Sequence, residues 1–285
     1  MSGNWHDILM ITYNRPEFTR LALGQLLKTC DDRMRVWIWH NGTHRETRDV
    51  VDEFRTHPRV YRVHICEENR KLREPTNWIW ETSDGAYLSK VDDDCLLPEG
   101  WAETLRRAHD DVPKLGIVGC WRFYEEDFVP ELAEKKIISL PGGHRLMRHH
   151  HVQGSGYVMK REVYEQMGPI LESESFTGYC QRVAAKGWEN GWYFPFIHEQ
   201  HMDDARSPYY PYKTNDEFMA NQPLTALKFD VRSLDEWKAR SMWLARRLQE
   251  DCSEGKNWVG WRGMVRRLGK RLSALIGQKE PWRVP

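Results

Sequence analysis

The stretch AYLSKVDDDCLLPEGW, residues 86–101, decides the fold class and marks the chemistry of this chain. Its first part has the apolar and aromatic composition of a β-strand, and Pro98 suits the first turn of a helix. Between them lie three consecutive carboxylates, Asp92, Asp93 and Asp94, which repel one another unless a positive charge lies among them. A divalent cation held by carboxylate oxygens is the usual solution, and a solvated acidic turn is the plainer one.

Strands and helices alternate on the N-terminal side of this stretch. Apolar runs at residues 7–12, 35–39 and 59–65 have the length of buried strands, and residues with helical spacing follow each run. This alternation predicts a parallel sheet with right-handed crossovers, in which ligands bind beyond the carboxyl ends of the strands. Polar side chains follow four of the predicted strands, at residues 13–15, 41–43, 69–71 and 92–94. We therefore expect these four strand ends to converge on one site.

The second half of the chain continues the same pattern less regularly. Further strands are predicted at residues 115–121, 157–159 and 192–197, whereas residues 122–150 are charged and predicted to be irregular. The run RHHH, residues 148–151, follows at the end of this irregular segment. It fits a solvated surface run, and the alternative is a metal or substrate site.

The composition excludes several classes of protein. The 285 residues carry 42 Lys or Arg and 42 Asp or Glu, which argues against a nucleic-acid binder that works through overall basicity. Six scattered cysteines without a CxxC pair indicate reduced thiols of a cytoplasmic protein. Signal-peptide features and a membrane-spanning apolar run are both missing from the sequence.

The C-terminal region has a different character from the rest. A capping box at residues 233–236 predicts a helix to about residue 250. Beyond it, residues 256–276 form a basic amphipathic helix whose apolar stripe consists of Trp258, Trp261, Val265, Leu268, Leu272 and Leu275. Residues 256–285 contain eight Lys or Arg and one Glu, so this end is strongly basic. The helix either docks on the catalytic domain or lies on an anionic membrane surface.

Two common nucleotide-binding motifs are missing from the sequence, and their absence narrows the possible classes of enzyme. The first strand is not followed by GxGxxG, and the chain has no GxxxxGK[ST], so a dinucleotide-binding Rossmann half and a P-loop are both disfavoured. A parallel-sheet enzyme with an acidic metal site at an internal strand end suits a diphosphate leaving group.

At this point the chain resembles the family 2 glycosyltransferases of the GT-A fold over residues 6–204. The matching features are the ITYNRP run at residues 11–16, the NGT turn at 41–43, the VDDD run at 91–94, the GSGY run at 154–157 and the KGW run at 186–188, with Arg182 before it. The resemblance implies a Rossmann-like α/β fold, with a mostly parallel sheet flanked by helices and a helical C-terminal extension.

The resemblance also implies a nucleotide-sugar donor, a Mn2+ or Mg2+ ion and inversion at the anomeric carbon. Asp92 and Asp94 would form the DxD pair, with Asp94 the first candidate as metal ligand, and Asp93 or Asp92 would reach the ribose. His198 would complete the metal or diphosphate site, and His201 is its close rival. Further residues expected to contact the donor are Thr12, Tyr13, Asn14, Arg15, Asn41, Asn69 and Lys71.

Two departures from the family pattern affect these expectations. His40 stands where the family usually has an aspartate, so recognition of the base is expected to differ. The family's general base lies in a Glu-Asp pair before a helical arginine, and here Glu174 is the first candidate and Glu172 the second. An inverting transfer needs such a group to take the proton of the acceptor hydroxyl.

We predict a GT-A catalytic domain over residues 1–204, with a nucleotide-binding half to about 115 and an acceptor half beyond it, and an extension over 205–285. The predicted function is transfer of a sugar to the hydroxyl of a glycan or lipid-linked acceptor. The enzyme would be cytoplasmic and peripheral at the inner face of the membrane, with no nucleic-acid partner. The alternatives are a non-catalytic nucleotide- or carbohydrate-binding protein on the same fold and, more distantly, a nucleotidyltransferase.

Overall fold

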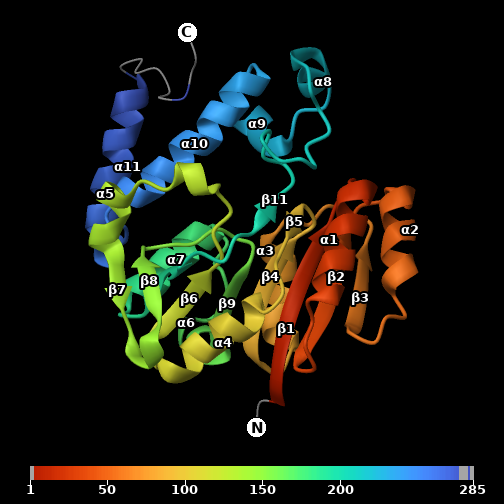
Figure 1. The fold of residues 1–285 in the computed structure, drawn as a ribbon, viewed down its shortest axis with the longest axis horizontal. Coiled ribbons are helices and arrows are strands. Elements are labelled where there is room, and N and C mark those ends of the chain that lie inside the picture. The colour runs from red at the N-terminus through yellow and green to blue at the C-terminus, as the bar shows by residue number, and fades with distance from the viewer. Residues whose placement is uncertain (1–2, 276–281, 283–285) are drawn as a thin grey trace.

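In the computed structural model, which describes residues 3–275 and 282, a nine-stranded sheet runs through the molecule in the order β3-β2-β1-β4-β9-β6-β10-β8-β7 (Figure 1). The first four strands are parallel and alternate with helices, as the apolar runs predict. Their bounds are β1 (Gly3–Thr12), α1 (Pro16–Lys28), β2 (Met34–Asn41), α2 (Arg45–Phe54), β3 (Val60–Cys66), α3 (Arg73–Thr82) and β4 (Gly85–Asp92). β1 lies between β2 and β4, which brings their carboxyl ends to one edge of the sheet.

The second half of the sheet is mixed. β9 runs antiparallel between β4 and β6, and β10 returns to the parallel direction beside β6. The elements of this half are β5 (Cys95–Leu96), α4 (Trp101–Asp111), β6 (Leu115–Gly119), β9 (Tyr157–Lys160), α6 (Arg161–Met167), α7 (Phe176–Ala185) and β10 (Glu189–Phe194). The predicted α/β sheet flanked by helices is confirmed, with β9 and β8 running against the other strands.

The prediction that residues 122–150 are irregular is wrong in part. This segment contains α5 (Pro130–Ala133), β7 (Ile137–Ser139) and β8 (Arg145–Arg148). β8 pairs antiparallel with β10, and β7 pairs with β8 and extends that edge of the sheet. Strands of three and four residues are too short to show a periodicity of their own. Pairing with β10, and not the local pattern, makes them strands.

Helices cover both faces of the sheet (Figure 1). One core lies under α1, α2 and α4, and Leu23, Val51 and Leu105 are among its buried side chains. The other core lies under α3, α6 and α7, with Trp80 and Tyr179 among its fully buried side chains. Burial on both faces explains why the central strands are almost continuously apolar.

The C-terminal extension lies beyond the carboxyl edge of the sheet, at the top of Figure 1. Its elements are β11 (Gln200–His201), which leads into it, then α8 (Asn215–Ala220), α9 (Leu224–Lys228), α10 (Leu234–Glu250) and α11 (Gly260–Leu275). Tyr210, Phe218 and Trp237 form a small core of their own. Among the described helices, none is both long enough and apolar enough to cross a bilayer.

The stripe predicted for the last helix divides into two parts. Trp258, just before α11, is half-buried and stacks on the ring of His150 with 4.0 Å between the centroids. Trp261, Val265 and Leu268 are 71%, 57% and 50% exposed. The side chains of Leu272 and Leu275 lie outside the described residues.

One buried histidine ties α4 to the sheet. The Nε2 atom of His109 lies 3.0 Å from the carbonyl oxygen of Val158 in β9, and the side chain is fully buried. Burial lowers the pKa of His109 to about 3. The folded protein therefore holds this imidazole neutral over a pH range in which an exposed imidazole is charged.

We expect acid to destabilise the fold through this residue. The unfolded chain takes up a proton near pH 6.5 and the folded chain only near pH 3, so stability present above about 6.5 is lost as the pH falls towards about 3. His109→Gln keeps an N–H for the Val158 carbonyl but cannot titrate. Urea unfolding at about pH 7.5 and about pH 4.5 should show a smaller loss for His109→Gln than for wild type. Equal losses in the two proteins would contradict this assignment.

Candidate active site

A pocket of about 840 Å3 opens at the carboxyl edge of the sheet, a volume typical of small-molecule sites. Residues from all four predicted strand ends line it, together with residues of the C-terminal extension. The predicted site residues among its lining are Tyr13, Asn14, Arg15, Asn41, Asn69, Lys71, Asp92, Asp93, Asp94 and His201. The structure thus brings together most of the side chains that the sequence pattern placed at one edge.

Asp93 is the carboxylate that holds the turn after β1. It accepts hydrogen bonds from the backbone N–H of Tyr13 at 3.1 Å and from the hydroxyl of Thr19 at 3.3 Å. Burial and the neighbouring Asp94 raise the pKa of Asp93 to about 7. Asn14 in this turn has φ +51°, a left-handed conformation that asparagine tolerates better than most residues.

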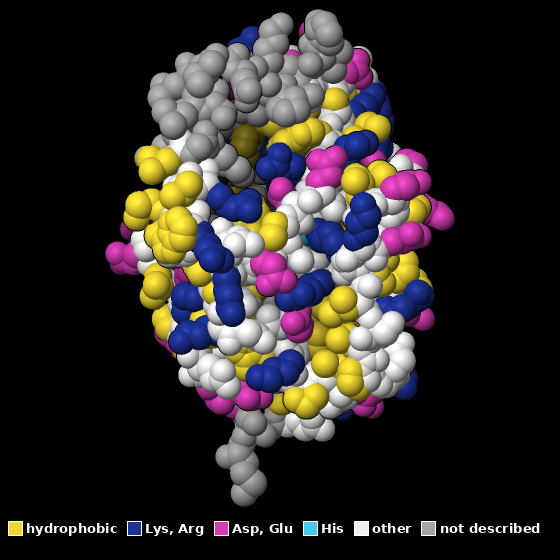
Figure 2. Space-filling view, turned by 90° about the vertical axis from the view of Figure 1, so that its left-hand side faces the viewer, with side chains coloured by type: hydrophobic (Ala, Val, Ile, Leu, Met, Phe, Trp, Pro, Cys, Tyr) yellow, Lys and Arg dark blue, Asp and Glu magenta, His cyan; other side chains and the backbone are white. Residues whose placement is uncertain are grey.

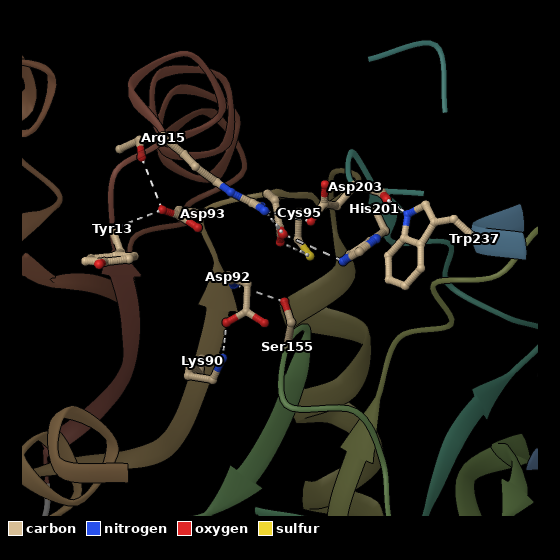
Figure 3. A network of polar contacts seen from close by, with 12 residues as sticks. Tyr13, Arg15, Lys90, Asp92, Asp93, Cys95, Ser155, His201, Asp203 and Trp237 are labelled. Carbon is tan, nitrogen blue, oxygen red and sulfur yellow. Dashed lines mark hydrogen bonds and ion pairs between the residues drawn. The ribbon is translucent and has the colours of Figure 1, made fainter. Parts of the chain in front are cut away.

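Arg15 is a cation built into the acidic cluster (Figure 3). Its guanidinium donates to Asp94 Oδ2 at 3.0 Å and to Asp203 Oδ2 at 2.8 Å, and so bridges the end of β4 to the segment after β11. Burial disfavours the charged guanidinium, but Asp203 and Asp94 outweigh burial, and the pKa of Arg15 is raised. Arg15 therefore stays charged beside the acidic run.

Asp94 has a second neighbour in His201, whose Nε2 lies 3.8 Å from Asp94 Oδ2. The two-residue strand β11 pairs with β5 and sets His201 opposite Cys95. Burial raises the pKa of Asp94, but His201 and Arg15 outweigh burial, so the pKa is lowered and the carboxylate is ionised.

The residues around Asp94 fit a divalent ion. Ligand atoms of Asp94, Cys95 and His201 all lie within 4.8 Å of one another. Burial raises the pKa of the Cys95 thiol well above its usual range, which keeps it protonated and a poor ligand. A carboxylate oxygen and an imidazole nitrogen remain, a donor pair that suits Mn2+ better than a soft metal. The guanidinium of Arg15 on the same carboxylate shows that this position attracts positive charge.

Asp92 faces a different set of partners from its two neighbours. Its carboxylate pairs with the ammonium of Lys90, which is 3% exposed. Its backbone N–H donates to the hydroxyl of Ser155 at 3.0 Å, and that hydroxyl donates to the buried carboxylate of Glu199. The GSGY run before β9 is thereby fixed against the end of β4.

The side chain of Asn41 organises the loop after β3. Its Oδ1 accepts from the backbone N–H of Arg70, and its Nδ2 donates to the carbonyl of Lys71, both at 3.0 Å. Asn69 Oδ1 accepts from the N–H of Lys71, which has φ +60°. Asn41 and Asn69 therefore shape the pocket wall, and Lys71 is part of the lining.

Four predicted site residues lie outside the described pocket lining. Thr12 is buried, and its hydroxyl lies 2.9 Å from Nδ1 of His40. His198 is exposed and packs against Tyr124, with ring centroids 5.7 Å apart. The other two residues are Glu172 and Glu174.

Glu174 serves the fold of the loop before α7. Both of its oxygens accept from Arg182, at 3.0 and 2.9 Å, and Oε2 also accepts from the N–H of Leu171 at 3.3 Å. Glu172 is exposed, and its carbonyl accepts from Arg73 at 2.5 Å. A base role for Glu174 would require this ion pair to open.

Sequence reasoning missed several residues of the site. Asp203 follows His201 by two residues, and a second acidic pair so close to a candidate ligand was a signal that could have been used. Lys90 was visible as a charge inside an apolar strand. The wall formed by Leu224, Trp237 and Arg240 had no local signal, because only the fold brings α9 and α10 to the pocket.

Comparison with known proteins agrees with this fold. The model of glycosyl transferase family 2 matches residues 7–168. Among solved structures, mannosyltransferase PcManGT from Pyrobaculum calidifontis, in complex with GDP-Man and Mn2+, is similar with a TM-score of 0.56 and 16% identity over 97% of this chain and 81% of that one. Residues 1–349 of S. aureus TarS, in complex with UDP-GlcNAc, give a TM-score of 0.55 and 13% identity over 95% and 81%. No curated protein matches the chain.

The contacts of Glu174 predict how its variants behave. Glu174→Gln should lower the free energy of unfolding by about 2 kcal/mol, because it weakens a partly buried, charge-assisted pair. Glu172→Gln should leave stability unchanged. Urea unfolding measures the free energy of unfolding of both variants, and single-turnover kinetics measures the rate of the chemical step.

The same two variants identify a base. If either carboxylate takes the acceptor proton, its glutamine variant loses roughly 10²–10⁴-fold in kcat with donor affinity unchanged. A stable Glu174→Gln protein with such a loss would overturn the structural role assigned to Glu174.

Proposed function

We propose that this chain, which belongs to glycosyl transferase family 2 and is a glycosyltransferase of the GT-A fold, is a metal-dependent inverting enzyme that moves a sugar from a nucleotide-sugar donor to an acceptor hydroxyl. The observation that carries the proposal is the position of Asp94 and His201, within reach of one ion in a pocket that four strand ends line. The complexes of PcManGT with GDP-Man and Mn2+ and of TarS with UDP-GlcNAc support the choice of donor and ion.

Each group at the strand ends has a task in this proposal. Asp94 and His201 would hold Mn2+ or Mg2+, which acts as a Lewis acid towards the departing nucleoside diphosphate. Asp93 fixes the backbone of the turn after β1, where Tyr13 lines the pocket. Lys90 pairs with the carboxylate of Asp92 and would orient it for the donor's ribose.

The pocket also carries cations for the diphosphate. Lys71 and Arg122 are part of the lining, and charged donors bind phosphate oxygens strongly. Arg15 belongs to the same group, because a divalent ion on Asp94 would compete with its guanidinium for that carboxylate. The Arg15 side chain, released from Asp94 and still charged, would then be available to the diphosphate.

The proposed metal site predicts the effect of one substitution. Asp94→Asn should lower Mn2+-dependent turnover by roughly 10²–10³-fold, as loss of one stabilising group at a developing anion does. It should also abolish the rise in melting temperature that Mn2+ gives in the presence of the donor. UDP-, GDP-, CMP- and dTDP-sugars, screened by thermal shift, supply the donor.

Glu17→Gln is the matched control, because Glu17 is an exposed carboxylate of the same pocket lining. It should respond to Mn2+ as wild type does. An Asp94→Asn protein with the full Mn2+ response would exclude Asp94 as a ligand.

We further propose that the enzyme works at an anionic membrane surface, on a glycan or lipid-linked acceptor. Trp261, Met264, Val265 and Leu268 form one exposed apolar face of α11, and Arg262 is exposed beside them. The face of the molecule that carries α11 shows Lys and Arg among apolar side chains, with some Asp and Glu (Figure 2). An apolar face beside basic residues is the pattern of helices that lie on anionic lipid.

The membrane proposal predicts a specific loss of binding. Full-length protein should float with vesicles that contain phosphatidylglycerol, and less with pure phosphatidylcholine. Trp261→Ser with Leu268→Ser should abolish flotation, because the buried apolar area is lost. Leu227→Ser, at another exposed apolar residue, should leave it unchanged. Flotation of the double variant at the wild-type level would contradict the proposal.

A further inference from the structure

Three consecutive histidines form a cluster outside the pocket lining. His149, His150 and His151 follow β8, and the backbone N–H of His149 donates to the carbonyl of Asn190 at 2.9 Å. The three ring centroids lie 4.1, 4.5 and 4.6 Å from one another. His149 and His150 are each 1% exposed. The expectation of a solvated surface run is therefore wrong for these two residues.

Backbone carbonyls hold two of the rings through one nitrogen each. Nδ1 of His149 lies 2.8 Å from the carbonyl oxygen of His151 and also 3.2 Å from the backbone nitrogen of His151, whose N–H points to it. Nδ1 of His150 lies 2.9 Å from the carbonyl oxygen of Cys252. An Nδ1–H that donates to a carbonyl leaves the lone pair on Nε2. This is the arrangement that orients a histidine for metal binding.

The Nε2 atom of His149 has no hydrogen-bond partner among the described residues. A buried polar atom without a partner is costly, and such atoms are rare in folded proteins. Nε2 of His150 lies 2.9 Å from Nδ1 of His151, so these two nitrogens already approach each other. An ion would give the unpartnered nitrogen of His149 a partner.

We propose that His149, His150 and His151 bind a late first-row divalent ion, Zn2+ in the first instance. One ring nitrogen from each residue lies within 4.8 Å of the other two. Nitrogens bound to one ion at about 2.1 Å lie roughly 3–3.5 Å apart, so small ring rotations close the site. A ligand set of imidazoles favours Zn2+ over Mg2+, which prefers oxygen. The His151 side chain is partly exposed and leaves access for a water as fourth ligand.

The position of this triad gives the ion a structural role. His150 contacts the carbonyl of Cys252, which also accepts from Trp258 Nε1 at 3.2 Å. Trp258 in turn stacks on the His150 ring. An ion on the triad would therefore fasten the segment between α10 and α11 to the sheet. It would stabilise the attachment of the C-terminal extension without entering the reaction.

The proposal is tested with untagged full-length protein stripped with EDTA. Calorimetric titration with Zn2+ in the Asp94→Asn background should give one site per chain, and Zn2+ should raise the melting temperature. Co2+ should give the visible absorption of a nitrogen-ligated ion. His151→Gln should weaken Zn2+ binding by at least the ~10–100-fold that loss of an outer-shell partner costs.

His57→Gln is the matched control and should bind Zn2+ as the parent does. If Asp94→Asn alone abolishes Zn2+ binding, the ion binds in the pocket and the proposal is wrong. The absence of a saturable site, or unchanged affinity in His151→Gln, would overturn it as well. If His151→Gln does not fold by circular dichroism, NMR of the histidine ring nitrogens in the Asp94→Asn protein decides, because Zn2+ shifts the signals of the histidines that bind it. Shifts outside residues 149–151 would overturn the proposal.

Discussion

The repulsion among three consecutive carboxylates at the end of β4 is the constraint on which the site depends. Each carboxylate pairs with a different part of the chain. Asp92 pairs with Lys90 of its own strand, Asp93 accepts from the turn after β1, and Asp94 pairs with Arg15. The three side chains therefore diverge. Asp94 is the one whose charge also faces His201, and so the one suited to an ion.

The ion pairs of the acidic cluster also attach the C-terminal extension to the rest of the fold. Arg15 binds Asp94 and Asp203 at once, and the carbonyl of Asp203 accepts from the indole N–H of Trp237 in α10 at 2.9 Å. A chain of polar contacts thus runs from the turn after β1 to α10. The pocket wall that α10 supplies is held by the acidic cluster itself. For this reason the extension is part of the site.

The sequence predicted the parts of the site that follow from general rules. Polar residues at four strand ends had to meet, because parallel strands share a carboxyl edge. The choice between His198 and His201 could not be made, because β11 is two residues long and exists only through its pairing with β5. Glu174 was chosen by its place before Arg182, and their ion pair depends on the path of the loop that leads into α7. Side-chain partners across loops have no periodic signal.

The apolar stripe of α11 shows the limit of periodicity in physical terms. An apolar period of 3.6 residues indicates a helix with one apolar and one polar face. It does not indicate whether protein, lipid or water covers each face. Here Trp258 stacks on His150 while Trp261, one turn later, is exposed, although both belong to one predicted stripe. The difference arises because the histidine cluster lies under the start of the segment and α11 then runs beyond it. An amphipathic sequence therefore predicts the helix, and only the neighbouring elements determine where its apolar face is covered.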